Sequence, residues 1–264
     1  MFYWIYDYPT WAMGLLFASV FLAGSLIGLF LFRSRFSKWI HSETRATEMV
    51  GVSLGSFSVL YGLLLGLVAV GAYQNFSSIT DLVTKESSCL TGLYRDVSAF
   101  PEPYRDKLEA DLRDYTRYTI DYGWPAMRKG HVAIGGTQRM TVFFNDLASF
   151  NPTDKRSEIV FAEAFRQFNS LTELRRARLA QATTGIPAVL WWVVGIGAFL
   201  NIVLIWMLDM EVHVHVILTA VLSLFLGVVI FLVAAMDNPF RGEVSVGPGA
   251  LELVYQTYMK PASP

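Results

Sequence analysis

The chain has 264 residues, of which 53% are hydrophobic and 14% aromatic, and its formal net charge is −1. Only 16% of the residues are charged, against roughly 25% in ordinary soluble domains. This composition argues against a soluble globular protein and indicates a protein embedded in a lipid bilayer. We expect no nucleic-acid partner.

Four apolar blocks contain no Asp, Glu, Lys or Arg, namely residues 11–32, 49–73, 186–208 and 214–236. A helix of about 22 to 25 residues reaches across a bilayer core of about 30 Å. The first block could also be a cleaved signal peptide, but no basic residue precedes it. It is also longer than a signal core of about 7 to 15 residues. We therefore predict four transmembrane helices, the first of which is retained.

Residues 74–185 form a charged region whose apolar residues recur at helical spacing. One apolar face would continue directly from the second span to Phe100 and comprises Ile79, Val83, Leu90, Leu93 and Val97. A second helix is predicted from Pro101 to Trp124-Pro125, and a third from about Thr137 to Phe150. Residues 151–154 have capping chemistry, and a fourth helix follows. Its expected face comprises Phe161, Phe165, Phe168, Leu171 and Leu174.

The predicted fold is therefore an all-α integral membrane protein with four transmembrane helices. Extensions of the second and third spans would form a helical extramembrane stalk. We divide the chain into a first transmembrane hairpin (1–73), a helical extramembrane region (74–185), a second hairpin (186–236) and a C-terminal tail (237–264).

Small residues line one face of the second span. At 100° per residue this face includes Gly51, Gly55, Gly62 and Gly66, which we call the glycine stripe. Such a surface lets another helix approach closely, since packing holds helices together in lipid. The opposite face carries Phe57, Leu60 and Leu64. These side chains either meet lipid or, around an oligomer axis, form an apolar constriction that gates by dewetting.

Two polar features adjoin the remaining spans. Asn201 lies near the middle of the third span, where we expect a hydrogen bond to another helix, with a substrate contact as the alternative. The fourth span ends at Asp237, Asn238 and Pro239, which favour a turn where the chain leaves the membrane, although a ligand site is an alternative. Arg241 would then lie among lipid headgroups or pair with a carboxylate such as Asp237.

Catalytic and metal-binding candidates are few. Cys89 is the only cysteine and is flanked by core positions, which favours packing over a reactive thiol. His213 and His215 are two residues apart, so a helix would point them in different directions. We assign no catalytic residue, no metal site and no cofactor.

Five segments in order resemble the bestrophin-like family of bacterial membrane proteins: "VLYGLLLGLVAVGAYQNF", "KESSCLTGLYRDVSAFPEPYR", "YTIDYGWPAM", "TGIPAVLWWVVGIGAFL" and "MDNPFRGEVSV". The resemblance runs from about Thr47 to Leu253. It implies a distant likeness to bestrophins, which are pentameric anion channels with four transmembrane helices per subunit and a helical cytosolic part. It also implies a homo-oligomer in the inner membrane.

Two functions follow from these observations. The first is an oligomeric channel, conducting anions, with the second span near the pore axis. The second is a non-conducting scaffold or signalling protein whose helical stalk binds a partner.

Topology signals conflict. A set of basic residues after the first span favours a stalk outside the cell, and comprises Arg33, Arg35, Lys38 and Arg45. Two other signals place the stalk in the cytosol. One is the likeness to bestrophins, and the other is a set of basic residues before the third span, Arg175, Arg176 and Arg178. We give slightly more weight to the basic residues after the first span, which place the stalk outside the cell.

Overall fold

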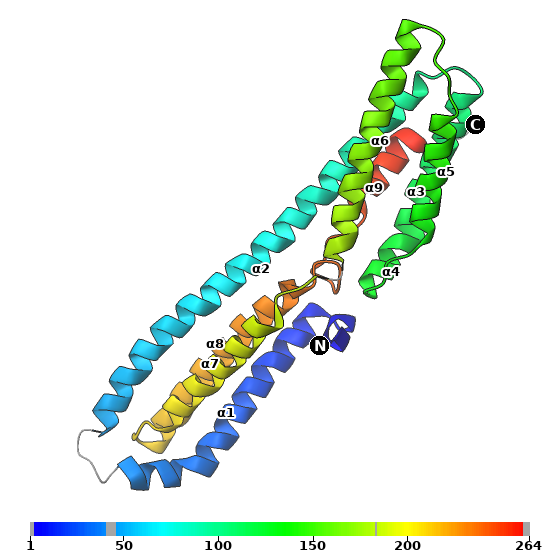
Figure 1. Cartoon of the computed structure of the whole chain (residues 1–264). Coiled ribbons are helices and arrows are strands. Elements are labelled where there is room, and N and C mark those ends of the chain that lie inside the picture. The colour runs from blue at the N-terminus through cyan, green and yellow to red at the C-terminus, as the bar shows by residue number, and fades with distance from the viewer. Residues whose placement is uncertain (1–2, 41–45, 183, 261–264) are drawn as a thin grey trace. The chain divides into compact units, whose positions relative to one another are not determined.

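The computed structural model describes residues 3–40, 46–182 and 184–260, which form helices and connecting turns and contain no strand (Figure 1). Arg45 lies outside the described residues, as does the side chain of Lys38. The chain divides into two compact units. The first, called the membrane unit, comprises Met1–Gln74, Gly185–Asp237 and Gly242–Val244. The second, called the helical unit, comprises Asn75–Thr184, Asn238–Arg241 and Ser245–Pro264.

All four predicted spans are helices in the structure. They are α1 (Thr10–Ile40), α2 (Ala46–Ser98), α7 (Ala188–Trp206) and α8 (Val212–Asp237). Each is long and apolar enough to cross a membrane. Helix α2 continues without a break through Tyr73 to Ser98, so the predicted extension of the second span is confirmed.

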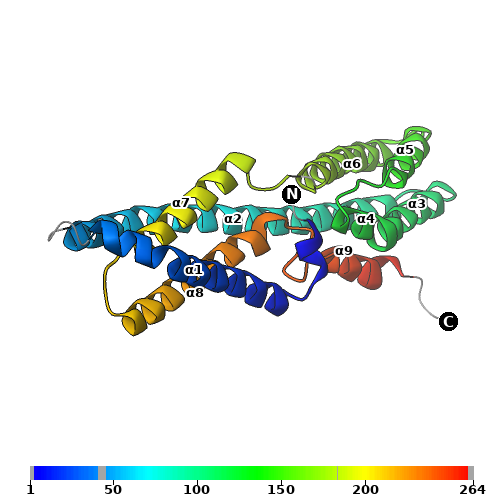
Figure 2. The same ribbon diagram turned by 90° about the horizontal axis from the view of Figure 1, so that it is seen from below.

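Helices α1 and α8 pack closely in an antiparallel pair (Figure 2). Gly14 lies against the ring of Phe231, and Gly227 lies against the backbone of Phe17 and Ala18. A Cβ at Gly227 would lie 3.0 Å from the Phe17 carbonyl oxygen. The missing side chain therefore permits the close approach on which helix association in lipid depends.

In two further close contacts of the membrane unit, an aromatic ring of one helix packs against a glycine of another. The Tyr61 ring of α2 occupies the space where Gly197 of α7 would carry a Cβ, and its hydroxyl donates to the Val194 carbonyl at 2.7 Å. The Trp206 indole lies in the same way on Gly28 of α1 and donates to the Ser25 carbonyl at 2.8 Å. Each ring fills the space between two helices, and its O–H or N–H group finds a hydrogen-bond acceptor there.

The helical unit packs the second part of α2 with three further helices. These are α3 (Tyr104–Tyr118), α5 (Gly135–Ala148) and α6 (Lys155–Gln181). Helix α6 begins with a reciprocal capping box, in which Asp154 accepts from the Ser157 N–H at 2.7 Å. All five apolar residues predicted for α2 are buried in the core. Cys89 packs against this core, and its thiol contacts the Gln167 carbonyl at 3.3 Å.

The second predicted helix does not end at Trp124-Pro125. A π-helical turn, Thr119–Gly123, follows α3, and α4 (Trp124–Arg128) then carries the chain onward. Proline lacks an N–H and would clash with the carbonyl four residues earlier in a regular helix. The wider turn directly before Pro125 accommodates the ring, so the proline marks a change of pitch and not a helix end.

The approach to the third span also differs from the expected continuous helix. Helix α6 ends at Gln181 and α7 begins at Ala188, with Pro187 in an extended conformation before it. Because Pro187 disfavours helical geometry at Ile186, the helix is interrupted here. The buried face of α6 is also rotated from the predicted one. It carries Ala164, Phe168, Leu171, Arg175 and Arg178, whereas Phe161 and Phe165 lie at its edge.

Residues beyond the fourth span contribute to the core of the helical unit. A short helix, α9 (Gly249–Val254), is followed by a π-helical turn, Tyr255–Met259, that packs beside α3. Leu251, Val254 and Met259 are buried in the same core as the other helices. The C-terminal segment is thus part of this unit's packing.

Candidate pore helix and the polar contacts around it

The three residues predicted as a constriction do not share one environment. Leu60 is 67% exposed, whereas Phe57 and Leu64 are partly buried and pack against the core of the membrane unit. All three line an open apolar groove of about 290 Å³, whose other wall is formed by Val193, Ile196 and Leu200 of α7. The Phe57 ring also stacks on Tyr61. Leu60 is therefore the member of this set that can face another subunit or a pore.

A broad face of α2 has no partner within the chain's described residues. It carries Leu60 and five similarly exposed apolar residues, Val52, Val59, Leu63, Leu67 and Val70. The glycine stripe borders this face. A Cβ at any of its four glycines would meet no atom within 4 Å among the described residues. The described residues therefore leave this stripe open to a close contact with a second copy or another protein.

The partly buried polar side chain of the third span reaches the second span. The Asn201 Nδ2 group donates to the Ser58 hydroxyl at 3.2 Å, joining α7 to α2. His213 is exposed and lies 3.4 Å from Glu211, whereas His215 is buried with Nε2 2.9 Å from the Ile205 carbonyl. The two histidines thus point in different directions, as predicted.

Helix α8 ends at Asp237, and a turn follows in which the Arg241 N–H donates to the Asn238 carbonyl at 3.0 Å. Pro239 takes part in a further backbone contact, since its carbonyl accepts from Val246 at 2.7 Å. The Arg241 guanidinium lies where a Cβ of Gly130 would be. Gly130 has a φ of 76°, so its backbone also favours glycine.

Asp237 itself anchors the start of the third span. Its side chain is buried and accepts from the Ile186 N–H through Oδ1 and from the Trp191 indole through Oδ2, the latter at 3.3 Å. Gly185 allows this approach, because a Cβ there would lie 2.9 Å from the carboxylate. The carboxylate therefore connects the two ends of the second hairpin.

We expect Asp237→Ala to destabilise the membrane unit by about 2 kcal/mol, because two donors lose a charged acceptor. The melting temperature of the purified protein in detergent measures this effect. Asp7→Ala, which removes an exposed carboxylate of the same unit, is the control. Equal melting temperatures for both variants would contradict the anchoring role.

Comparison with known proteins assigns the family. The model of the bestrophin-like domain matches residues 19–251. The chain belongs to the bestrophin-like family. Its segments "TGIPAVLWWVVGIGAFL" and "MDNPFRGEVSV" contribute the partners of the Asp237 contact. This bestrophin-like chain therefore brings together two segments that are far apart in its sequence.

Solved structures support the same fold. A bacterial bestrophin homologue from Klebsiella pneumoniae is similar at 12% identity and a TM-score of 0.66, covering 92% of this chain and 96% of the other. A point variant of a membrane protein is similar at 12% identity and a TM-score of 0.67, with the same coverage. Comparison with curated proteins gave no match. At these identities the structures indicate the fold alone.

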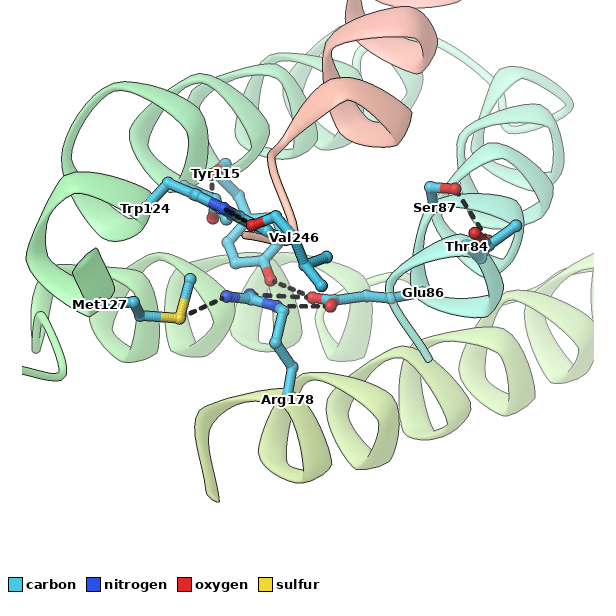
Figure 3. A network of polar contacts seen from close by, with 9 residues as sticks. Thr84, Glu86, Ser87, Tyr115, Trp124, Met127, Arg178 and Val246 are labelled. Carbon is cyan, nitrogen blue, oxygen red and sulfur yellow. Dashed lines mark hydrogen bonds and ion pairs between the residues drawn. The ribbon is translucent and has the colours of Figure 1, made fainter. Parts of the chain in front are cut away.

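A buried ion pair joins two helices of the helical unit (Figure 3). Glu86 of α2 is 0% exposed and Arg178 of α6 is 1% exposed. The Arg178 Nε and Nη2 atoms donate to the two carboxylate oxygens of Glu86 at 2.6 and 3.0 Å. This bidentate geometry is the favourable one for a guanidinium and a carboxylate. The ion pair joins the two longest helices of the unit.

Aromatic side chains enclose the ion pair. The Tyr115 hydroxyl donates to Glu86 at 3.4 Å, and the Arg178 guanidinium lies 4.9 Å from the centre of the Trp124 ring. Burial, followed by the charge of Glu86, raises the pKa of Tyr115 to about 12, so the hydroxyl keeps its proton. The Trp124 indole donates to the Val246 carbonyl at 3.0 Å. This network thereby holds the C-terminal segment in the core.

Sequence reasoning missed the ion pair, although the sequence contained a signal for it. Glu86 falls between Val83 and Leu90 on the apolar face of α2. Arg178 likewise lies on the buried face of α6. Opposite charges at core positions of two helices are rare unless they pair. That observation predicts contact between the helices.

Proposed function

We propose that the protein is a subunit of an oligomeric channel in the inner membrane, with the second spans near the pore axis. The observation that carries this proposal is the uncovered face of α2, which combines exposed apolar residues with the glycine stripe. Other spans of the chain pack on the opposite side of α2, through Tyr61 and Leu65. The uncovered face is thus available to neighbouring copies and to a central path.

The proposal assigns the constriction to Leu60, together with exposed residues of the same face such as Val59 and Leu63. Phe57 and Leu64 would support it from the groove beside α7. A narrow apolar segment cannot replace the hydration shell of an ion, so it blocks conduction while it is dry. Family membership supports anions as the permeant ions and a pentamer as the assembly. We assign no catalytic role to any residue.

Leu60→Ser should wet the constriction and raise the ion flux of the reconstituted protein about tenfold or more, because the hydroxyl can contact water. Release of chloride from liposomes under an imposed gradient measures the flux. Leu31→Ser is the matched control, since Leu31 of α1 is also 67% exposed. It should leave the flux unchanged.

Absence of flux from the parent and from both Ser variants would contradict conduction. The alternative function, a scaffold whose helical unit binds a partner, would then take its place. An equal increase for Leu60→Ser and Leu31→Ser would contradict the location of the constriction and indicate a general leak.

A further inference from the structure

Two carboxyl groups face each other between α3 and α5, which pack side by side in the helical unit (Figure 1). The side chains of Asp111 on α3 and Asp146 on α5 are close enough to share a hydrogen bond. The Asp146 side chain is 15% exposed. The Oδ2 atom of Asp111 is buried, and no N–H or O–H group of the described residues donates to it. Ionised carboxylates contain acceptors alone, so a hydrogen bond between the two requires a proton.

Neighbouring charges decide which of the two carboxyl groups holds that proton. The Lys107 ammonium lies 2.7 Å from the Asp146 carboxylate and favours its ionised form. Asp114, the other acidic side chain that acts on Asp111, lies 2.7 Å from the Arg139 guanidinium. Asp111 is therefore the member of the pair that takes up the proton.

Two π-helical turns also adjoin α3, and their titratable side chains contact other groups. Asp121 pairs with Arg117 at 3.4 Å, and the Tyr258 ring lies against the Arg95 guanidinium. A metal ion is the alternative occupant between two carboxylates. However, the described parts of the chain contain no group of three or more Asp, Glu, His or Cys side chains suited to a metal ion. This donor set favours a proton.

The shared proton makes the stability of the helical unit depend on pH. Burial, followed by the hydrogen bond with Asp146 and the charge of Asp146, raises the pKa of Asp111 to about 7. An Asp in an unfolded chain has a pKa of about 3.9. Between these two values the folded protein holds a proton that the unfolded chain has released. The stabilisation is therefore complete at the acidic end of this range and is lost as the pH rises through about 7.

We propose that Asp111 and Asp146 form a proton-dependent contact that joins α3 to α5. In the protonated state the Asp111 hydroxyl donates to the Asp146 carboxylate and connects the two helices. Loss of the proton leaves two negative charges facing each other, of which Lys107 can balance one, and the contact loosens. The helical unit would thereby respond to pH near neutrality. This response does not require that the protein conducts ions.

Melting of the full-length protein in a neutral detergent tests the contact. Between about pH 5.5 and 8, Asp111 should lower the melting temperature of the parent by about 3 °C, a modest fall because solvent screens this half-buried group. Asp111→Asn cannot ionise, and its amide can donate to Asp146, so this variant should lose that part of the fall. Asp106→Asn removes an exposed carboxylate from the same helix and should retain it. Histidines titrate in the same range but are common to all three proteins.

Infrared difference spectra between the same pH values observe the proton directly. The parent should show a band of a protonated carboxyl group at the lower pH that Asp111→Asn lacks. Lys107→Met should move the midpoint of this band to higher pH, because the cation lowers the pKa of Asp111. A side chain that only fills space would not move a midpoint. Identical difference spectra for the parent and Asp111→Asn, or equal pH dependence of their melting, would overturn the proposal.

Discussion

Arg178→Met should lower the free energy of unfolding by about 3 to 5 kcal/mol, because it leaves the Glu86 carboxylate buried without a counter-charge. The Tyr115 hydroxyl, at 3.4 Å, is then the remaining donor to that carboxylate among the described residues. Methionine fills a similar volume, so the loss reflects the charge and its hydrogen bonds more than a cavity. A fall of about 10 °C in melting temperature is the expected reading.

Two further variants distinguish the loss of the ion pair from the effect of replacing any arginine of α6. Arg176→Met removes an exposed charge from the same helix and should change the melting temperature little. The double variant Glu86→Leu with Arg178→Met removes both charges and should recover most of the lost stability, since apolar replacements of buried ion pairs are often tolerated. If Arg178→Met and Arg176→Met melt together, the ion pair does not stabilise the helical unit.

Gly62→Leu and Gly66→Leu should weaken assembly while leaving the fold of each subunit intact. A Cβ at either position would meet no atom of another part of the chain within 4 Å among the described residues, so the substitutions start from open space within the subunit. A close contact between copies would be overpacked, at a cost of about 1 to 3 kcal/mol per contact. Sedimentation of the protein in detergent measures the mass of the assembly and should report smaller species.

Gly197→Leu provides the contrast. A side chain there would overlap the Tyr61 ring within the same chain, so this variant should impair folding of the membrane unit itself. If both stripe variants keep the parent's mass and melting temperature, the glycine stripe faces lipid and the proposed assembly through it fails.

The spans were predictable because lipid imposes a simple pattern on the sequence. Blocks without charge and long enough to cross the bilayer leave little freedom in assigning α1, α7 and α8. The apolar positions of α2 beyond Tyr73 were equally clear, since the helical period continues through them. Local sequence did not predict the course of the chain at Pro125, because a proline within a helical pattern usually ends the helix, whereas here a π-helical turn accommodates its ring and the helix continues.

Faces and partners were harder to predict than elements. Periodicity separates the two sides of α2 but does not tell which side meets the rest of the chain, so Phe57 and Leu64 were grouped with the exposed Leu60. Likewise, Asp237 looked like the end of a helix, whereas its carboxylate accepts bonds from residues near the start of the third span. Contacts between segments distant in sequence leave no local periodic signal.

The Asp237 contact also has a consequence for the order of synthesis. The Ile186 N–H and its acceptor are 51 residues apart in the chain. When the third span first leaves the ribosome, neither this N–H nor the Trp191 indole has the partner that it uses in the finished protein. Both gain it only after the whole fourth span has been made. The hydrogen bonds at the start of the third span therefore form late. We expect the two helices of the second hairpin to reach their final packing in the membrane together rather than one at a time.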